Sequence, residues 1–507
     1  MSRIDNSFKS VTVGAFGLLL GYLLNFITRR IFVQYLSIEY LGLNGLFFNI
    51  FSLLSFAELG IGTAITYSMY RPLAFGETNK INLLVAFHRK VSYIVGIFFL
   101  ITGLSITPFL QVLLKEAPDI QYLKLYYIVY IIDIGIGFFI SYKRLLLYAD
   151  QKRYIDNAYR YGFDLGRHTL QIIVLVMAHS YLLYLLVVLV LNIIENVLIH
   201  KKIDRIYPYL KKPAEGKLDK SDFTEIKKNV FGLMTNKLGN IVVNGTDNLL
   251  IVKFVDLASA GIYGGYYMLV VAITNVIYMF HTSILASIGN LVATESNEDH
   301  YADFKTLDFV IAWLVGFCAI ALFTLINPFI QLWLGSEYTF PPMVVFFIIL
   351  NFYLSGMLMS VKTFSQSMGL FWHNRYKPLF EASFNLIFSI GLAIKFGILG
   401  IFIGTTVSMI LTSVWFEPFV LYRHGLQKSV ISYYFMLIFN TAITVVFGWI
   451  TWKVVGLITI THELLHFIVR VGVTAFLPNA MYLIIAFRRT EYKHVVRILS
   501  MALKPSE

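Results

Sequence analysis

The sequence predicts an all-α polytopic membrane protein with about 14 transmembrane helices, and three observations lead to this fold class. Of the 507 residues, 58% are hydrophobic and 14% are charged, whereas soluble domains carry about 25% charged residues. The mean hydropathy of +0.71 reflects apolar runs of roughly 20 residues along the whole chain, each long enough to span a bilayer. The third observation is that the first helix pair recurs in the second half of the chain. Together they exclude a soluble enzyme.

The apolar runs define each expected helix in order. They predict membrane helices at 11–36, 43–70, 91–114, 122–146, 158–178, 181–200, 230–254, 262–291, 307–333, 343–369, 378–396, 399–422, 430–456 and 464–487. The first run lacks a small-residue cleavage site, so we expect an uncleaved helix rather than a signal peptide. The single cysteine, Cys318, excludes an internal disulfide and a thiolate metal site.

Lysine and arginine predict the orientation of the chain. Most of the 41 Lys and Arg residues fall in loops on the side of both termini. The other side holds only Lys115, Lys124, Lys253, Lys395 and Lys453. Because basic loops stay in the cytoplasm, both termini are expected to be cytoplasmic. The net charge of +12 is therefore assigned to orienting loops, and no nucleic-acid partner is expected.

A long basic segment, 201–229, divides the expected helices into six and eight. It contains eight lysines and two prolines. We therefore expect an N-lobe at 1–200, a basic cytoplasmic linker at 201–229, a C-lobe at 230–422, and a last helix pair with a basic tail at 423–507.

The two lobes contain a weak internal repeat. A constant shift of 219 residues places Asn25 on Asn244, Gly42 on Gly261 and Gly45 on Gly264. The first helix pair and the seventh and eighth helices therefore look like copies. A parallel repeat of six helices is typical of transporters whose lobes rock around a shared central cavity, and we expect two pseudo-symmetric six-helix lobes plus two C-terminal helices.

Two junctions carry a family resemblance. The segment 247–264, with Asp247 and a Gly-Ile-Tyr-Gly end, resembles the junction of the seventh and eighth helices in polysaccharide flippases. The segments 40–45 and 57–62 are similar to the first junction and second helix of Wzx-type O-antigen and capsule flippases. The chain is thus identified as resembling this family of the multidrug/oligosaccharidyl-lipid/polysaccharide exporter superfamily.

The resemblance implies a function and partners. Such a protein moves an undecaprenyl-diphosphate-linked oligosaccharide from the cytoplasmic to the outer leaflet of the bacterial plasma membrane. Partners would be this substrate, membrane lipids, and the polysaccharide polymerase and glycosyltransferases of the same process. By analogy with lipid II flippases, helices thirteen and fourteen would form a groove for the lipid tail. The protein would not be an enzyme.

Polar residues at helical spacing predict the substrate cavity. Gly17, Gly21, Asn25 and Arg29 share one face of the first helix, next to Arg30. The seventh helix has an asparagine stripe at the same spacing, which we expect to face the sugars and which is flanked by Lys237 and Asp247: Asn236, Asn240, Asn244 and Asn248. We expect Arg29, Arg30, Lys237 and Lys362 to hold the diphosphate, because guanidinium and ammonium groups suit phosphate oxygens. The alternative is that these cations, and Arg470, merely extend to the membrane interface.

Carboxylates inside the expected spans are candidates for ion coupling. Glu58 and Asp133 lie near the middle of their helices, where an ionised acid is costly. We expect Glu58 first and Asp133 second to bind H⁺ or Na⁺ and so couple ion movement to rocking of the lobes, with Asp164 as a third candidate. The alternatives are neutral, hydrogen-bonded acids at Glu58 and Asp133, and an ion pair of Asp164 with Arg167 or His168.

Other function classes fit less well. An ion-coupled multidrug exporter of the same superfamily remains an alternative, although those transporters usually have twelve helices. His462, Glu463 and His466 match the H-E-x-x-H zinc motif, but no third ligand follows nearby, so no metal and no cofactor are expected. A polytopic glycosyltransferase or polymerase would need a large outer loop, and the expected outer loops are short. No phosphate-binding G-x-x-x-x-G-K-[ST] motif is present, which excludes a built-in ATPase of that type.

Overall fold

The structure, a computed structural model, describes residues 3–54, 60–114, 120–224, 226–228, 230, 246–294 and 297–502. Across these residues it is helical and contains no strand, which confirms the predicted fold class. Ten of the described helices are long and apolar enough to cross a membrane. The chain divides into two compact units, Met1–Gly261 and Ile262–Glu507.

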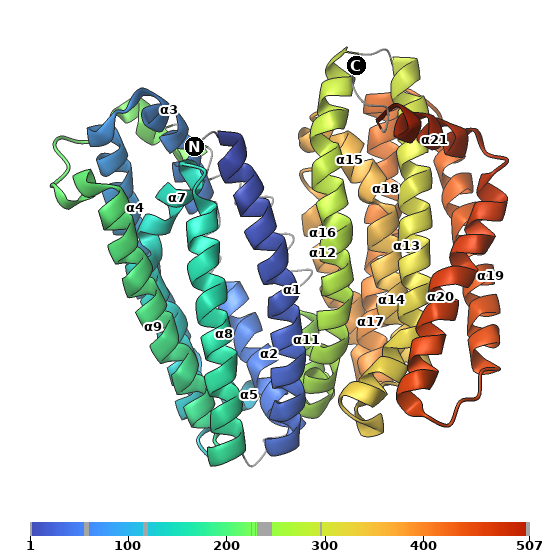
Figure 1. Cartoon of the computed structure of the whole chain (residues 1–507), viewed down its shortest axis with the longest axis horizontal. Coiled ribbons are helices and arrows are strands. Elements are labelled where there is room, and N and C mark those ends of the chain that lie inside the picture. The colour runs from blue at the N-terminus through green and yellow to red at the C-terminus, as the bar shows by residue number, and fades with distance from the viewer. Residues whose placement is uncertain are drawn as a thin grey trace. The chain divides into compact units, whose positions relative to one another are not determined.

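The first unit is a bundle of long helices whose axes are nearly parallel (Figure 1). Its helices are α1 (Arg3–Tyr35), α2 (Ile38–Leu54), α3 (Ile61–Phe75), α4 (Thr78–Ile106), α5 (Leu110–Leu113), α6 (Leu123–Ile140), α7 (Arg144–Ala149), α8 (Arg153–Ala178), α9 (Tyr181–Ile206) and α11 (Asp247–Phe254). Within the bundle α1 packs on α8, and α6 packs on α4 and α9. An apolar core joins α3, α4, α7 and α9 through Ile65, Leu84, Leu146 and Ile203. This core fixes the place of α7, on which the charged site depends.

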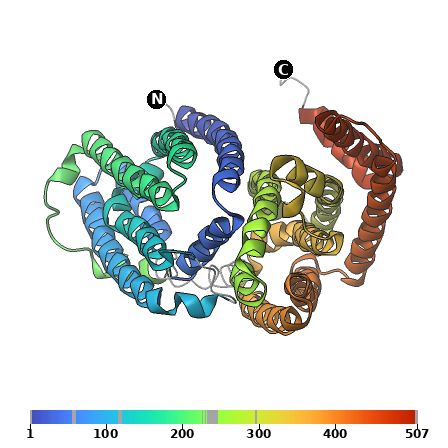
Figure 2. The ribbon, with the colours of Figure 1, turned by 90° about the horizontal axis from the view of Figure 1, so that it is seen from below.

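The second unit is also a bundle of long helices. After α12 (Leu257–Thr294), which begins in the first unit, it contains α13 (Asn297–Trp333), α14 (Pro342–Met357), α15 (Met359–Ser367), α16 (Lys377–Phe396), α17 (Ile398–Leu411), α18 (Ser413–Val420), α19 (Ile431–Gly456), α20 (Glu463–Ala486) and α21 (Thr490–Ala502). The helices α19 and α20 pack against each other and against α13, at one edge of this unit (Figure 2). They are the predicted thirteenth and fourteenth helices.

Several predicted spans are divided in the structure, and the span expected at 122–146, for example, comprises α6, a 3-10 turn at Ser141–Lys143 and α7. The single span expected at 43–70 is divided between α2 and α3, because Gly60 has a φ of 89° and begins α3 in the left-handed region. The span expected at 343–369 is divided between α14 and α15. The span expected at 399–422 consists of α17, α18 and a π-helical turn at Leu421–Leu426. In each place the apolar pattern continues while the helix does not.

Candidate functional site

A network of charged side chains links four helices of the first unit. We call it the charge network and define it by Asp133, Arg144, Asp156, Asp164, Arg167, Asn192 and Glu195, which lie on α6, α7, α8 and α9. Asp156 is 2% and Glu195 4% exposed. Two nearly inaccessible carboxylates require specific partners, because burial of an unpaired charge is costly.

Arg144, at the first position of α7, pairs with both of these carboxylates. Its guanidinium donates to Asp156 Oδ1 at 2.9 Å, to Glu195 Oε1 at 2.8 Å and to Asn196 Oδ1 at 3.0 Å. The hydroxyl of Tyr148, one turn further on, donates to Asp156 Oδ2 at 2.6 Å. Arg144 thereby connects α7 to α8 and α9 through charge-assisted hydrogen bonds.

Arg167 continues the network along α8. It pairs with Asp164 and donates to Asn192 Oδ1 at 2.7 Å and to Glu195 Oε2 at 3.3 Å. The predicted alternative for Asp164, an ion pair with the arginine three residues away, is therefore present. Glu195 receives one arginine on each carboxylate oxygen, so it is the link between the two halves of the network.

Asp133 joins the network through an amide rather than a cation. Asn192 Nδ2 donates to Asp133 Oδ1 at 2.8 Å and to Oδ2 at 3.1 Å. Within the described part of the chain no guanidinium or ammonium group forms an ion pair with Asp133. Asp133 is half-buried in the middle of α6. Of the four network acids it is the one whose charge is least compensated.

The composition of the charge network suits it to take up a proton. It contains four carboxylates and two guanidinium groups, so it carries an excess of two negative charges when every acid is ionised. In a low-dielectric interior that excess is costly, and uptake of a proton or a monovalent cation would reduce it. Among the described residues no group of three or more His, Cys, Asp or Glu side chains is arranged to hold a metal ion.

The predicted polar face of α1 contains residues in different surroundings. Asn25 is exposed and donates to Gly21 O of its own helix at 2.9 Å. Arg29 is partly buried and donates to Gly261 O at 2.6 Å. Arg30 is exposed on the same helix. Arg29 therefore has a definite structural bond to the start of α12, and its role with phosphate stays a prediction.

The predicted repeat has a reciprocal contact in the first unit. A Cβ atom on Gly42 would lie 2.1 Å from Leu257 O, and a Cβ atom on Gly261 would lie 2.3 Å from Ile38 O. The shift of 219 residues relates Gly42 to Gly261 and also Ile38 to Leu257. The contact of Gly42 with Leu257 and the contact of Gly261 with Ile38 are therefore equivalent under the shift, as a local two-fold relationship requires. Glycine permits this close backbone approach because it has no Cβ.

The other predicted site residues are distributed as follows. Glu58, Lys237, Asn240 and Asn244 lie outside the described residues. Asp247 is partly buried at the first position of α11. Lys362 is partly buried on α15, beside Thr363, whose hydroxyl forms a 2.7 Å hydrogen bond with His281 Nδ1. The structure therefore does not test the asparagine stripe or the proposed set of four cations.

The second unit holds its own buried charges. Lys377 Nζ lies 2.6 Å from Glu381 Oε2 and 2.7 Å from Glu417 Oε1, and Ser413 Oγ donates to Glu381 Oε1 at 2.8 Å. We call Lys377, Glu381 and Glu417 the lysine triad. Separately, Asp308 on α13 is 1% exposed and accepts a 2.5 Å hydrogen bond from Ser360 Oγ on α15.

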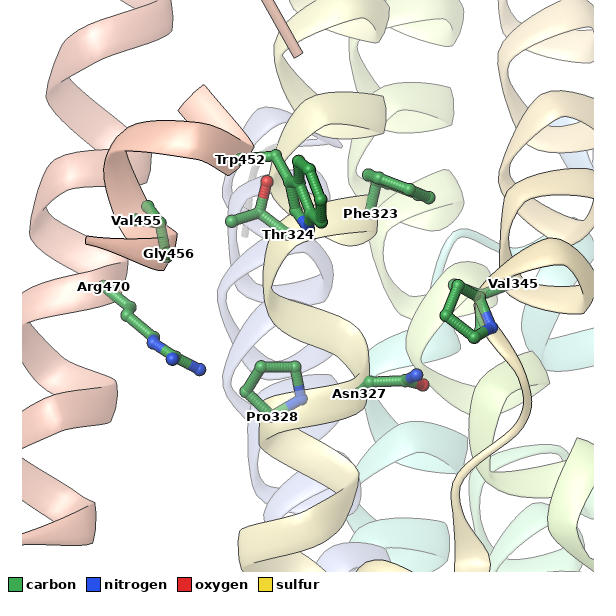
Figure 3. Close-up of a pocket in the computed structure, with 10 residues that line it drawn as sticks. Phe323, Thr324, Asn327, Pro328, Val345, Trp452, Val455, Gly456 and Arg470 are labelled. Atoms are coloured by element: carbon green, nitrogen blue, oxygen red, sulfur yellow. The ribbon is translucent and has the colours of Figure 1, made fainter. Parts of the chain in front are cut away.

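Arg470 lies in a small pocket between α13, α19 and α20. The pocket has a volume of about 170 Å³ and includes Thr324, Asn327 and Trp452. Figure 3 shows Arg470 extending from α20 toward Pro328 on α13. The buried hydroxyl of Thr324 has no hydrogen-bond partner among the described residues. The prediction that Arg470 extends to the membrane interface is not tested by this direction and stays a prediction.

The H-E-x-x-H segment has a structural role at the start of α20. His462 is the N-cap residue, and its Nδ1 accepts a 3.3 Å hydrogen bond from the backbone N–H of Leu465. His466 Nε2 lies 2.9 Å from Ile458 O and is bonded to it. The two imidazoles therefore satisfy backbone groups of the helix end and the preceding loop.

Sequence reasoning missed most of the charged groups that the structure brings together. Arg144 lies at the end of a predicted span and Asp156 lies between two predicted spans, where charged residues are ordinary. Lys377, Glu381 and Glu417 lie near span ends for the same reason. Asp133 was selected because it lies deep within an expected span. The same criterion could have selected Glu195, which follows fourteen uncharged residues of α9.

Comparisons with known proteins place this fold among transporters. No family model matches the sequence, and no curated protein matches it. The chain is similar in structure to the lipid II flippase MurJ in an inward closed conformation, with 13% identity, coverage of 95% of this chain and 99% of that chain, and a TM-score of 0.66. It is also similar to an inward-facing multidrug resistance MATE family transporter of the MOP superfamily, with 13% identity, coverage of 83% and 99%, and a TM-score of 0.63.

A third solved structure is also similar to the chain. It is a MOP superfamily transporter from Pyrococcus furiosus, with 14% identity, coverage of 85% of this chain and 98% of that chain, and a TM-score of 0.52. At these identities the likeness shows the fold. The chain therefore has the helical fold of these structures and, with ten described helices long and apolar enough to cross a membrane, is a multi-pass membrane protein.

Proposed function

We propose that the chain is a flippase for undecaprenyl-diphosphate-linked oligosaccharides that works by alternating access. The observation that carries the proposal is the extent of the fold match: the lipid II flippase covers 95% of the chain, whereas the multidrug transporter covers 83%. The extra coverage is enough for two membrane helices. The chain has such a pair, α19 and α20, next to α13. A lipid-linked substrate would use these two helices, because its tail stays in the bilayer and needs a groove on the membrane-facing side of the protein.

The proposed location and partners follow from the same substrate. The positive-inside distribution supports cytoplasmic termini in a bacterial plasma membrane. Glycosyltransferases would supply the lipid-linked oligosaccharide, and a polymerase would consume it on the outer side. Cations of the first helix and of α15 would meet the diphosphate, since charge inside a membrane protein is tolerated where it faces water or a charged ligand.

The proposed driving force is an ion gradient that acts through the charge network. Its excess of carboxylates favours uptake of H⁺ or Na⁺, and Asp133 is the acid whose charge is least compensated. Because Asn192 connects Asp133 to Arg167, a change at Asp133 alters contacts of α8 and α9. A bound ion shifts a transporter between two arrangements only by its differential affinity for them.

A multidrug exporter is the second candidate. It is favoured by the comparable TM-score of the MATE family transporter, 0.63 against 0.66. The match covers 99% of that transporter's chain. On this alternative the substrate would be a soluble or amphipathic cation, and α19 and α20 would be an addition without a role in substrate binding.

One reconstitution experiment separates the two candidates. The full chain is placed in phosphatidylcholine vesicles with a polyprenyl-diphosphate-linked oligosaccharide, and an impermeant lectin reports how much sugar reaches the outer face. Parallel vesicles contain a fluorescent cationic drug, and release of the drug is followed. Sugar translocation without drug release supports the flippase. Drug release without sugar translocation contradicts it and supports the exporter.

A further inference from the structure

The basic segment after α9 is held against the start of α4. Asn79 Nδ2 donates to Glu215 O at 3.0 Å, and the Glu215 N–H donates back to Asn79 Oδ1 at 3.1 Å. Asn82 Nδ2 donates to Lys212 O at 2.7 Å, and Lys80 forms a 3.0 Å ion pair with Asp222. The described part of this segment, up to residue 224, is therefore fixed in position by α4.

This attachment forms a basic pocket with a volume of about 740 Å³. We define the basic pocket by its four cations, Arg89, Lys90, Lys217 and Lys220, and its two aromatic side chains, Phe87 and Phe223. The two rings are 5.9 Å apart between centroids and meet edge to face, and Phe223 is half exposed. Among the residues that the structure describes, no carboxylate lines the pocket.

The four cations lack internal neutralisation. Among the described residues none of them forms an ion pair. Three described acids of the same segment are placed away from these cations: Asp222 pairs with Lys80, and Glu215 and Asp219 are exposed and do not line the pocket. Four like charges around one cavity repel one another, and an anion with more than one negative charge, or several anions, would relieve the repulsion.

The position of the pocket along α4 selects a membrane ligand. Lys90 is followed by the apolar run 91–114, which is the predicted membrane span. Arg89 and Lys90 therefore lie at the level of the lipid headgroups, and Leu83, Phe87 and Leu218 supply apolar wall next to them. Basic pockets at this level recognise lipid phosphates.

We infer that the basic pocket binds the phosphate headgroups of anionic phospholipids in the leaflet at the Lys90 end of α4. On the proposed topology this is the cytoplasmic leaflet. The inference concerns resident lipid and does not depend on which substrate the protein moves. Bound headgroups would hold the basic segment at the membrane surface, in addition to the bonds from Asn79, Lys80 and Asn82.

The test compares two double variants that remove the same charge from the same segment. Lys217→Gln with Lys220→Gln removes two pocket cations, and Lys227→Gln with Lys228→Gln removes two exposed lysines that do not line the pocket. Phosphatidylglycerol retained by the full chain from phosphatidylcholine and phosphatidylglycerol vesicles is titrated by native mass spectrometry. A lysine near an anionic surface contributes roughly fivefold to binding, so the variant that lacks two pocket lysines should bind phosphatidylglycerol roughly 25-fold more weakly, and the control should match the parent.

Further arms make each outcome decisive. Asn79→Ala keeps every charge but releases Glu215, and should also weaken phosphatidylglycerol binding. If both double variants bound phosphatidylglycerol equally weakly, binding would depend on the overall surface charge, and the proposal of a specific pocket would be wrong. Lysine-dependent binding of inorganic diphosphate from solution would overturn a lipid ligand. If binding of undecaprenyl diphosphate depended on these lysines while binding of phosphatidylglycerol did not, the assignment of phospholipid as the ligand would be wrong. Thermal unfolding of each variant in phosphatidylcholine vesicles establishes that it is folded.

Discussion

In the first unit, charged side chains from four helices form one connected network, whereas in the second unit they form small separate clusters. Arg144 and Arg167 share Glu195, and Asn192 extends the connection to Asp133. In the second unit the lysine triad joins α16 and α18, while Asp308 has its own partner on α15. A change at one carboxylate can therefore spread across the first unit but stays local in the second.

The comparison also shows what the two halves of the repeat retained. The backbone approach of Gly42 and Gly261 is reciprocal, so the positions that depend on the absence of a side chain agree under the shift of 219 residues. The charged side chains do not follow that shift: Asp133, Arg167 and Glu195 correspond to Phe352, Leu386 and Val414. The glycine contact therefore agrees with the repeat, whereas the charge network has no charged counterparts at this shift.

The largest expected effect on stability comes from breaking the charge network at Arg144. Arg144→Gln leaves Asp156 and Glu195 buried without their shared cation, and loss of one partner of a buried ion pair costs about 3–5 kcal/mol. Thermal or denaturant unfolding in detergent should show this loss. Arg160→Gln on α8 is the matched control, because Arg160 is exposed and forms no ion pair among the described residues. An equal loss in both variants would contradict a special role for the network.

The lysine triad should respond less, because it can be repaired locally. Lys377→Met leaves Glu381 and Glu417 buried next to each other, and we expect a loss of about 2–4 kcal/mol. Adding Glu417→Gln removes the excess charge and should restore at least half of that loss. The unfolding free energies of the single and double variants measure the coupling. A double variant that is less stable than the single one would mean that the triad is connected to further charges, as in the first unit.

The reciprocal glycines should have a smaller, shared effect. Gly42→Ala and Gly261→Ala each place a Cβ against a backbone oxygen of a neighbouring helix, and overpacking of this kind costs about 1–3 kcal/mol. The control is Gly21→Ala on α1, where nothing lies within 4 Å of the added Cβ. That control should be neutral or stabilising, since alanine favours helix. If the two substitutions gave clearly different losses, the contact would not be the symmetric one that the repeat predicts.

The sequence predicted the fold class and the place of most helices because a bilayer imposes one length and one polarity on every span. It predicted a continuous span where α2 and α3 are separate, because hydropathy does not report the positive φ of Gly60. Helix breaks inside apolar runs depend on packing, which composition does not record.

The candidate site was less predictable, for a different physical reason. Depth along a helix identified Asp133, but it could not show that Asn192 bonds to it from α9. The charge network depends on which faces of α6, α7, α8 and α9 meet, and Arg144 or Lys377 at a span end resembles an ordinary interfacial cation until those faces are known. Asp164 illustrates both limits, since its pairing with Arg167 was foreseeable from spacing while the further bonds of Arg167 were not.

The smallest effect on stability, and the most specific effect on transport, is expected at Asp133. Asp133→Asn keeps the shape of the side chain and an oxygen that can accept from Asn192, so the unfolding free energy should change by less than about 1 kcal/mol. The variant cannot bind and release a proton or balance a sodium ion. In the vesicle assay, a pH or sodium gradient should accelerate sugar translocation by the parent protein and have no effect on this variant. The matched control is Asp308→Asn in the second unit, which replaces a buried carboxylate that accepts a hydrogen bond from the Ser360 hydroxyl. Because Asp308 is not part of the charge network, its variant should keep the gradient response. If only Asp308→Asn lost the gradient response, the coupling carboxylate would be in the second unit. If both variants kept the response, neither carboxylate would couple transport to the gradient.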